Sequence, residues 1–147
     1  VLEFTPTIER NYCIYATCCM SNDNDDAPLE IHLYSPAIDD IHIETLTVIA
    51  HYHKTKYKLW LNHTINIARG WIENSICSFG LISLPYLWGP ALEWCSMTKF
   101  KAIRSLWRIP ITEEEKLFAV KYGVERLEDK FEDANFDYLN PFRESVI

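Results

Sequence analysis

Two short apolar runs, each closed by a proline, constrain the fold of this chain most strongly. Residues 81–84 (LISL) end at Pro85, and residues 103–109 (IRSLWRI) end at Pro110. Runs of this length that stop at a proline predict buried strands. The stretch 79–115, which holds both runs, is therefore expected to form the centre of the fold.

Three other segments are predicted to be extended. Residues 11–17 (NYCIYAT) are apolar at both sets of alternating positions, which predicts a strand covered on both faces. Residues 29–34 (LEIHLY) alternate apolar and polar side chains, which predicts a half-exposed strand. Residues 59–67 (LWLNHTINI) interleave apolar residues with Asn, His and Thr, a mixture that suits an extended segment at the margin of a sheet.

Helices are predicted between and after these strands. A first helix begins at a capping Asp39 or Asp40 and runs to about His53; its β-branched residues also suit a strand, but its length favours a helix. A second follows the capping-box pair Thr112 and Glu115, and a third covers residues 124–134 with apolar side chains three and four apart. This order predicts a mixed α/β (α+β type) fold, with helices packed on a mixed β-sheet.

Length and composition are consistent with one domain over residues 1–147. A chain of 147 residues that is 48% hydrophobic can bury a substantial core without metals or disulfides. The first residue is Val1 rather than Met, so a segment before it is expected to have been trimmed. Apolar runs stay below the ~18 residues of a membrane helix, so no membrane partner is expected.

Charge separates the classes of partner. The formal net charge of −7 argues against nucleic acid, which selects for basic surfaces. Ten acidic but only five basic residues lie between residues 113 and 147. This acidic region is either a solvated helical surface or a docking surface for a basic partner, whose association it would accelerate.

Candidates for chemistry are few. The five cysteines have no metal-like spacing and are expected to be reduced, mostly buried thiols of a cytoplasmic protein; no metal or cofactor is expected. A Cys–His pair of Cys95 or Cys77 with His63 is conceivable, but Cys95 follows Trp94 in an apolar setting that would leave the thiol inert. No nucleophile-elbow, phosphate-loop or zinc-protease motif occurs.

The order of several short motifs resembles the bacterial branch of the suppressor of fused (SUFU-like) domain family. The motifs are residues 62–67 (NHTINI), 81–86 (LISLPY), 106–112 (LWRIPIT), 122–128 (YGVERLE) and 138–141 (YLNP), with a weaker echo at 16–21 (ATCCMS). Cys19 stands where the family usually has Gly, and Gly70 where it usually has Pro. The resemblance implies a single α/β domain that binds protein and has no characterised catalytic residue. The eukaryotic member holds an extended segment of a transcription factor, and bacterial members often look like toxin-neutralising immunity proteins.

The leading hypothesis is therefore a non-enzymatic protein-binding module that sequesters or neutralises a partner, either a basic toxin or an extended peptide segment. Packing in the core is the favoured explanation of the Trp and Tyr residues; alternatively, some of them line a groove for a partner, since Trp and Tyr are favoured interface anchors. The binding edge is expected near residues 62–71, where a partner strand could add to the sheet. Candidate partner-binding residues are Asn62, His63, Asn66, Trp71, Tyr86 and Trp88. A thiol- or histidine-dependent enzyme and a structural homo-oligomeric subunit are the alternatives, and the oligomeric state stays open.

Overall fold

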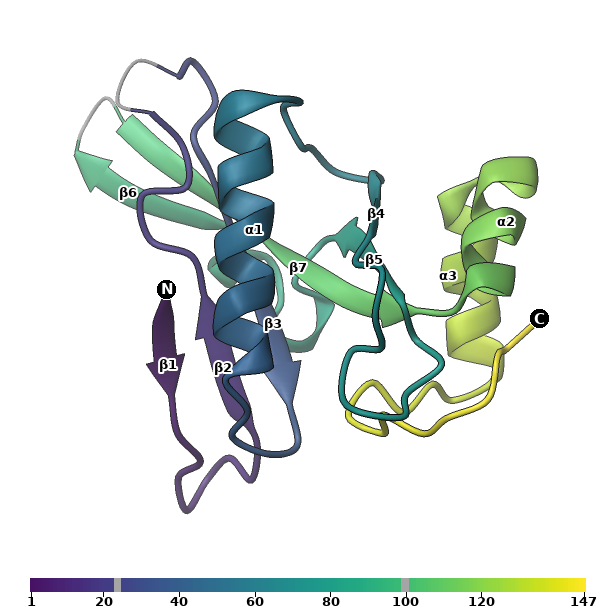
Figure 1. Ribbon diagram of the computed structural model, residues 1–147. Coiled ribbons are helices and arrows are strands. Elements are labelled where there is room, and N and C mark those ends of the chain that lie inside the picture. Colours follow the sequence, from purple (N-terminus) through teal and green to yellow (C-terminus); the bar gives the residue numbers. More distant parts are fainter. Residues whose placement is uncertain (23–24, 99–100) are drawn as a thin grey trace.

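The computed structural model describes residues 1–22, 25–98 and 101–147, and in these residues seven strands form one mixed sheet (Figure 1). Its path is β1-β2-β3-β7-β5-β4, and β6 also pairs with β7. The strands are β1 (Leu2–Phe4), β2 (Cys13–Ala16), β3 (Leu29–Ser35), β4 (Thr64–Asn66), β5 (Phe79–Ser83), β6 (Trp94–Thr98) and β7 (Lys101–Ile111). The helices are α1 (Ile41–Thr55), α2 (Glu113–Tyr122) and α3 (Val124–Asp133), with short 3-10 turns η1 (Tyr86–Trp88) and η2 (Pro90–Leu92). The predicted mixed α/β architecture is confirmed, whereas the extent of the domain, residues 1–147, stays a prediction.

Strand β7 is the centre of the sheet. It pairs in parallel with β3 on one edge, and antiparallel with β5 and β6 on the other. The second apolar run lies inside it, but the strand continues through Pro110 to Ile111 instead of ending at the proline. Proline is tolerated there because the pairing with β3 extends only to Trp107, so the edge that lacks the Pro110 N–H has no strand to bond.

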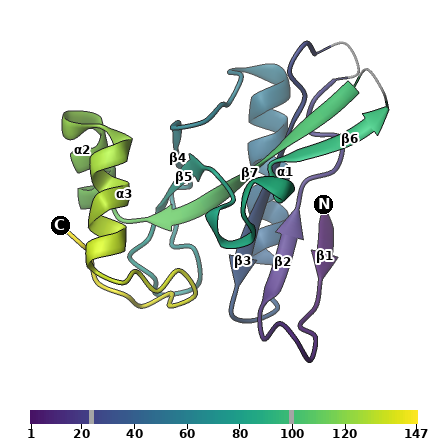
Figure 2. The same cartoon turned by 180° about the vertical axis from the view of Figure 1, so that it is seen from behind.

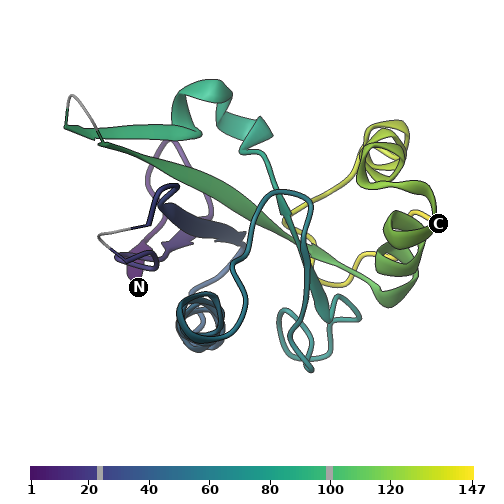
Figure 3. The same cartoon turned by 90° about the horizontal axis from the view of Figure 1, so that it is seen from above.

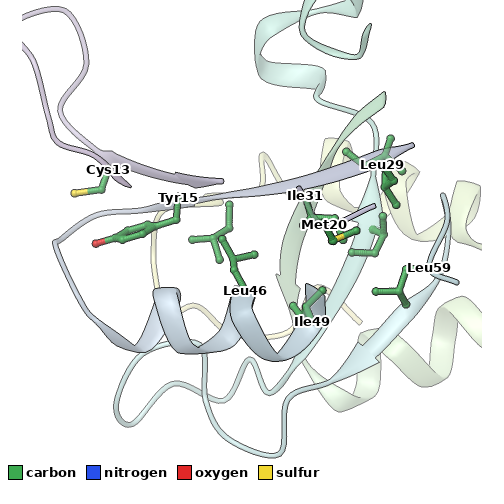
Figure 4. Close-up of a cluster of buried hydrophobic side chains, with 11 residues drawn as sticks. Cys13, Tyr15, Met20, Leu29, Ile31, Leu46, Ile49 and Leu59 are labelled. Atoms are coloured by element: carbon green, nitrogen blue, oxygen red, sulfur yellow. The ribbon is translucent and has the colours of Figure 1, made fainter. Parts of the chain in front are cut away.

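The two faces of the sheet carry separate hydrophobic clusters. Figure 4 shows Leu46 and Ile49 of α1 facing Tyr15 and Ile31 of the sheet, within a cluster on the α1 side. The second cluster joins β7 to α2 and α3, which lie beyond the far end of β7 (Figure 3). The tertiary structure thus has α1 on one face and the helical pair on the other.

Strand β3 differs from its prediction as a half-exposed strand. Its residues from Ile31 to Ser35 are all buried, because both faces are covered. Leu29, Ile31 and Leu33 belong to the α1-side cluster, while the ring of Tyr34 packs edge-on against Trp107 at 5.2 Å. Alternation of polar and apolar residues misled the prediction because the polar set here, His32 and Tyr34, is large and aromatic enough to pack in a core.

The helices begin where the sequence indicated. Helix α1 runs from Ile41 to Thr55, and the Ile41 N–H donates to Asp39 Oδ1 at 3.0 Å. Thr112 caps α2 with a complete capping box: the Glu115 N–H donates to Thr112 Oγ1, and the Thr112 N–H donates to Glu115 Oε2. Gly123 follows at φ 96°, a value that favours glycine, and is the single residue between the end of α2 and the start of α3.

A buried ion pair fastens the C-terminal segment to this cap. Arg143 Nη1 and Nη2 donate to the two carboxylate oxygens of Glu115 at 2.6 and 2.7 Å, and Arg143 Nη2 also donates to the Pro110 carbonyl at 2.9 Å. The Val146 N–H donates to Glu115 Oε1 at 3.1 Å. Glu115 therefore connects α2 to the C-terminal segment, and Arg143 connects that segment to the end of β7.

Removal of the cation from this pair is expected to be costly. Arg143→Met leaves the Glu115 carboxylate buried with no countercharge, and the free energy of unfolding should fall by about 3–5 kcal/mol in urea denaturation. Arg143→Met combined with Glu115→Gln should recover part of the loss, because no charge then stays buried. Arg126→Met, at an exposed site, is the control; equal effects of Arg126→Met and Arg143→Met would contradict the assigned role.

Two buried histidines, His32 and His42, should make stability depend on pH. Burial lowers the pKa of each from 6.5 to about 4. Between these values the unfolded chain binds more protons than the folded chain, so stability is complete above about pH 6.5 and is lost as the pH falls toward 4. Each ring also bonds a serine hydroxyl at 2.9 Å, Ser105 for His32 and Ser35 for His42.

Polar substitutes for these rings should weaken the pH dependence. His32→Asn and His42→Gln keep a hydrogen-bonding group near the serine, but remove the titration. The loss of unfolding free energy between pH 7 and pH 4.5, measured by urea denaturation, should be smaller in each variant than in the parent chain. His51→Gln, at an exposed site on α1, is the control and should leave this loss of unfolding free energy unchanged. A loss equal to that of the parent chain in both buried variants would show that other groups cause the pH dependence.

Candidate functional site

An open groove of about 950 Å³ lies between α1 and β4 and is called the α1–β4 groove. One wall is a face of α1 that includes Val48 and Tyr52, four residues apart, which are 66% and 43% exposed. The other wall is β4 with its flanks, from Asn62 to Arg69. Exposed apolar side chains on a helix that faces a sheet margin are typical of a surface that receives another chain.

Strand β4 is an end strand of the sheet, as the composition of residues 59–67 predicted; the other end strand, β1, lies at the opposite margin (Figure 2). The Ile67 N–H donates to the Ser78 carbonyl at 3.0 Å, and the His63 carbonyl accepts from the Ile82 N–H at 2.9 Å. Bonded and free positions alternate along such a strand, so the backbone groups of Thr64 and Asn66 point away from β5. Their N–H and C=O groups form a free edge at the groove.

Side-chain contacts order both walls of the α1–β4 groove. Arg69 Nη1 forms an ion pair with Glu44 Oε2 at 3.1 Å, and Arg69 Nη2 donates to Thr45 Oγ1 at 3.4 Å, so the segment after β4 is joined to α1. The rings of Tyr57 and His63 lie 5.5 Å apart. His63 Nδ1 accepts the Trp60 N–H at 3.1 Å, which orients its ring.

A second groove, of about 630 Å³, lies between η1 and α3 and is called the α3 groove. Aromatic and apolar side chains line it, including Trp107, Phe131 and Tyr138, and its rim is acidic. The acidic residues of the rim are Glu125, Glu128, Asp129 and Glu132. Glu128 is held in place by Ser83 Oγ, which donates at 2.6 Å, and by the Tyr86 hydroxyl, which donates at 3.1 Å.

The structure distributes the predicted binding residues over separate places. Asn62, His63 and Asn66 line the α1–β4 groove, and Tyr86 lines the α3 groove. Trp88, 50% exposed, ends η1 beside the α3 groove. Whether any of these residues contacts a partner stays a prediction.

Trp71 is a correction to that set. It is only 2% exposed, and its ring lies 6.3 Å from that of His42 in α1. The segment before β5 folds back, with the Trp71 N–H donating to the Cys77 carbonyl at 2.8 Å, and turns the indole inward. A side chain so placed cannot anchor a partner on the surface.

Sequence reasoning missed the contribution of α1 to the groove. Val48 and Tyr52 lie outside the helix face that carries Leu46, Ile49 and His53, the face that packs on the sheet. Two apolar residues four apart on the solvent side were the available signal. That signal became interpretable only when β4 was placed next to α1.

The structure does not favour a Cys–His catalytic pair. Cys95 is exposed on β6, opposite Ile103, so the expected apolar setting was wrong. Cys77 is buried, and desolvation raises the pKa of its thiol. The expectation of mostly buried thiols was also wrong, since Cys18, Cys19 and Cys95 are exposed and only Cys13 and Cys77 are buried.

Across residues 1–22, 25–98 and 101–147, no group of three or more His, Cys, Asp or Glu side chains could hold a metal ion. Within the same ranges, no helix has the length and apolar character needed to cross a bilayer.

Comparison with known families gives an unambiguous match. The model of the family described as suppressor of fused protein (SUFU) matches residues 1–144. The chain belongs to the suppressor of fused protein family. A crystal structure from Neisseria gonorrhoeae FA 1090, described as that of a SUFU homologue, is 31% identical and superposes with a TM-score of 0.72. The match covers 99% of this chain and 87% of the Neisseria chain, so the resemblance to the bacterial branch is confirmed.

More distant SUFU structures share the fold alone. A chain of the Sufu–Fu complex crystal structure is 11% identical with a TM-score of 0.67, and the match covers 99% of this chain and 75% of that chain. Drosophila Suppressor of Fused is 13% identical with a TM-score of 0.68, and the match covers 99% of this chain but only 42% of that one. A search of curated proteins found no match.

Thiol reactivity should separate a binding protein from a thiol enzyme. Iodoacetamide at neutral pH should modify Cys18, Cys19 and Cys95 in the folded chain, and Cys13 and Cys77 only after unfolding. Cys18 should be slow, because its hydrogen bond to Cys19 raises its thiol pKa. Mass spectrometry over time gives the rates; one cysteine reacting much faster than free cysteine would support the enzyme alternative.

Proposed function

We propose that this SUFU family member is a non-enzymatic protein-binding module that holds an extended segment of a partner in the α1–β4 groove. The observation that carries the proposal is the free edge of β4 facing an exposed apolar helix face. The segment would lie along β4 as an additional strand. Its backbone would bond the free N–H and C=O groups of Thr64 and Asn66.

The two walls of the groove would make different contributions to recognition. Main-chain bonds to β4 supply affinity that is independent of sequence, while alternate side chains of the added strand enter the space beside α1. Val48 and Tyr52 offer apolar contact there, and Asn62 and His63 offer polar contact near one end. Exposed strand edges are normally blunted in monomeric proteins, and β4 is short but carries no proline or lysine.

The acidic α3 groove would steer the partner. Its four carboxylates surround an aromatic floor, which suits the long side chains of lysine and arginine. Since the chain carries a net charge of −7, a basic partner would associate faster than a neutral one. A cationic toxin has this chemistry, and neutralising one by contact would make the chain an immunity protein.

Two other observations support this class of function. One structural neighbour comes from a protein–protein assembly, the Sufu–Fu complex, so a relative of the same fold is known in a complex. The exposed cysteines Cys18, Cys19 and Cys95 are free, as is usual in a reducing compartment, which supports a proposed cytoplasmic location.

Groove variants test the proposal once a partner has been isolated from the source organism and purified. Val48→Lys puts a charge against the apolar wall, and Thr64→Pro removes a free-edge N–H without removing a bond to β5. Each should weaken binding at least about tenfold in calorimetric titration, which corresponds to about 1.4 kcal/mol. Amide exchange at Thr64 and Asn66 should be fast in the free chain and slow in the complex.

Val120→Lys is the matched control, because Val120 is equally exposed, at 70%, on α2 outside both grooves. It should change the dissociation constant less than about twofold. Parent-like binding by both groove variants, with no new amide protection on β4, would place the partner elsewhere. Loss of affinity in Glu132→Lys alone would move the principal contact to the α3 groove.

A further inference from the structure

Arg108, in the middle of β7, has a buried charge that nothing in the proposed function uses. The side chain is 0% exposed. Within the described ranges, none of its three guanidinium nitrogens has a hydrogen-bond partner. The contrast with Arg143 is sharp, because Arg143 is also buried yet bonds two carboxylate oxygens and two carbonyls.

The position of Arg108 is defined by its neighbours. A Cβ atom added to Gly80 would lie 2.7 Å from Arg108 Nε, so the side chain crosses β5 directly over this glycine. It heads toward the segment between β4 and β5, which contains Trp71 and Cys77. Trp71 Nε1 is a second buried nitrogen with no partner in the described part of the chain.

The surroundings of Arg108 are rich in hydrogen-bond donors and positive charge. The guanidinium and the indole N–H can only donate, and the first turn of α1, which carries His42, presents the positive end of its dipole. Burial is the largest cause of the low pKa of His42, and the charge of Arg108 is the second; Asp39 acts in the opposite direction, and Arg69 lowers the pKa by a smaller amount. The surplus of donors and positive charge here disfavours a lone cation and favours an anion.

Within the described residues, the ionisable groups do not supply that anion. Glu115 is bonded to Arg143, and Asp39 Oδ1 accepts the Ile41 N–H at the start of α1. The thiol of Cys77 is close enough to interact with Arg108, but burial raises its pKa and keeps it protonated at neutral pH. A buried ion without a countercharge costs several kcal/mol, which is a large part of the stability of a small domain.

We propose that Arg108 binds a small inorganic anion of chloride size, with the Trp71 indole N–H as a second donor on the same side. The site lies under the segment that links β4 to β5 and beside the first turn of α1. Full enclosure of the guanidinium excludes large or organic anions. The anion would neutralise Arg108 and would fix the segment that carries Trp71, and with it the start of β5.

Chloride titration of the ¹⁵N-labelled chain tests the site directly. Sodium chloride replaces sodium gluconate at constant ionic strength and pH, and the indole N–H signals are followed, with Trp71→Phe to assign the Trp71 signal. We expect this signal to shift saturably, while the other tryptophan signals drift little. A Trp71 signal that does not move, or that drifts linearly like the rest, would overturn the proposal.

Thermal unfolding in the same series gives an independent result. The melting temperature of the parent chain should rise by about 5–10 °C when chloride reaches a hundred times its dissociation constant. Arg108→Met, which keeps the length and removes the charge, should abolish the dependence and should melt higher than the parent without chloride. Arg104→Met is the control, since Arg104 pairs with Glu93 at 2.7 Å, and it should keep the full chloride response.

A crystal grown with bromide in place of chloride would show where the anion binds. A crystal of the parent chain grown in sodium bromide should show an anomalous peak within hydrogen-bonding distance of the Arg108 guanidinium, and none in Arg108→Met. If Arg108→Met does not fold, the titration and the bromide peak of the parent chain decide alone. Bromide found only at surface lysines, together with a chloride-independent melting temperature, would refute the site.

Discussion

Strand β7 has to be hydrogen-bonded along both edges and covered on both faces, and most of the structure follows from how the chain meets these two demands. On one edge β3 bonds residues 104–107; on the other, β5 and β6 follow one another along the strand. Helix α1 packs on one face of the sheet, and α2, α3 and the segment after them pack on the other face at the far end of β7. The places where β7 lacks a neighbouring strand are where unusual residues occur: Pro110 needs no partner for its nitrogen, and its carbonyl accepts Arg143 instead.

Arginine is used in two opposite ways around this strand. Arg143 is bidentate to Glu115, so the cost of burying two charges is offset by several hydrogen bonds and by the fixing of the chain end to α2 and β7. Arg108 reaches from β7 into the α1 side, and among the described residues none hydrogen-bonds its guanidinium. Arg143 shows that this fold can supply a buried guanidinium with acceptors. An anion from solution would supply acceptors to Arg108, and it is the simplest explanation of the difference between the two arginines.

Local signals in the sequence predicted most of the local structure, although β1 and β6 were missed, and the remaining failures concern tertiary contacts. The apolar runs before Pro85 and Pro110 predicted β5 and β7. The Thr112–Glu115 pattern predicted the start of α2, because the capping-box hydrogen bonds join residues that are close in sequence. Burial of Trp71, by contrast, depends on a segment folding back beneath α1, and burial of the second face of β3 depends on Trp107, more than seventy residues later. The partly exposed face of α1 was missed for the same reason, because an exposed valine becomes informative only beside a free strand edge. Of the candidate site residues, Asn62, His63 and Asn66 fell together because they are neighbours in sequence, on β4 and just before it.

Family membership and the proposed binding specificity are carried by different parts of this molecule. The motifs LISLPY and LWRIPIT lie on β5 and β7 and just beyond them, where side chains are chosen by packing, so they identify the fold and place few constraints on a partner. The α1–β4 groove is built at the margin, from an end strand of three residues and from helix positions that the core does not use. Substitutions at Val48, Tyr52 or Asn66 would change the groove while leaving both hydrophobic clusters intact. A common core can therefore present different grooves, and the partner of this chain has to be sought through the chemistry of its margin.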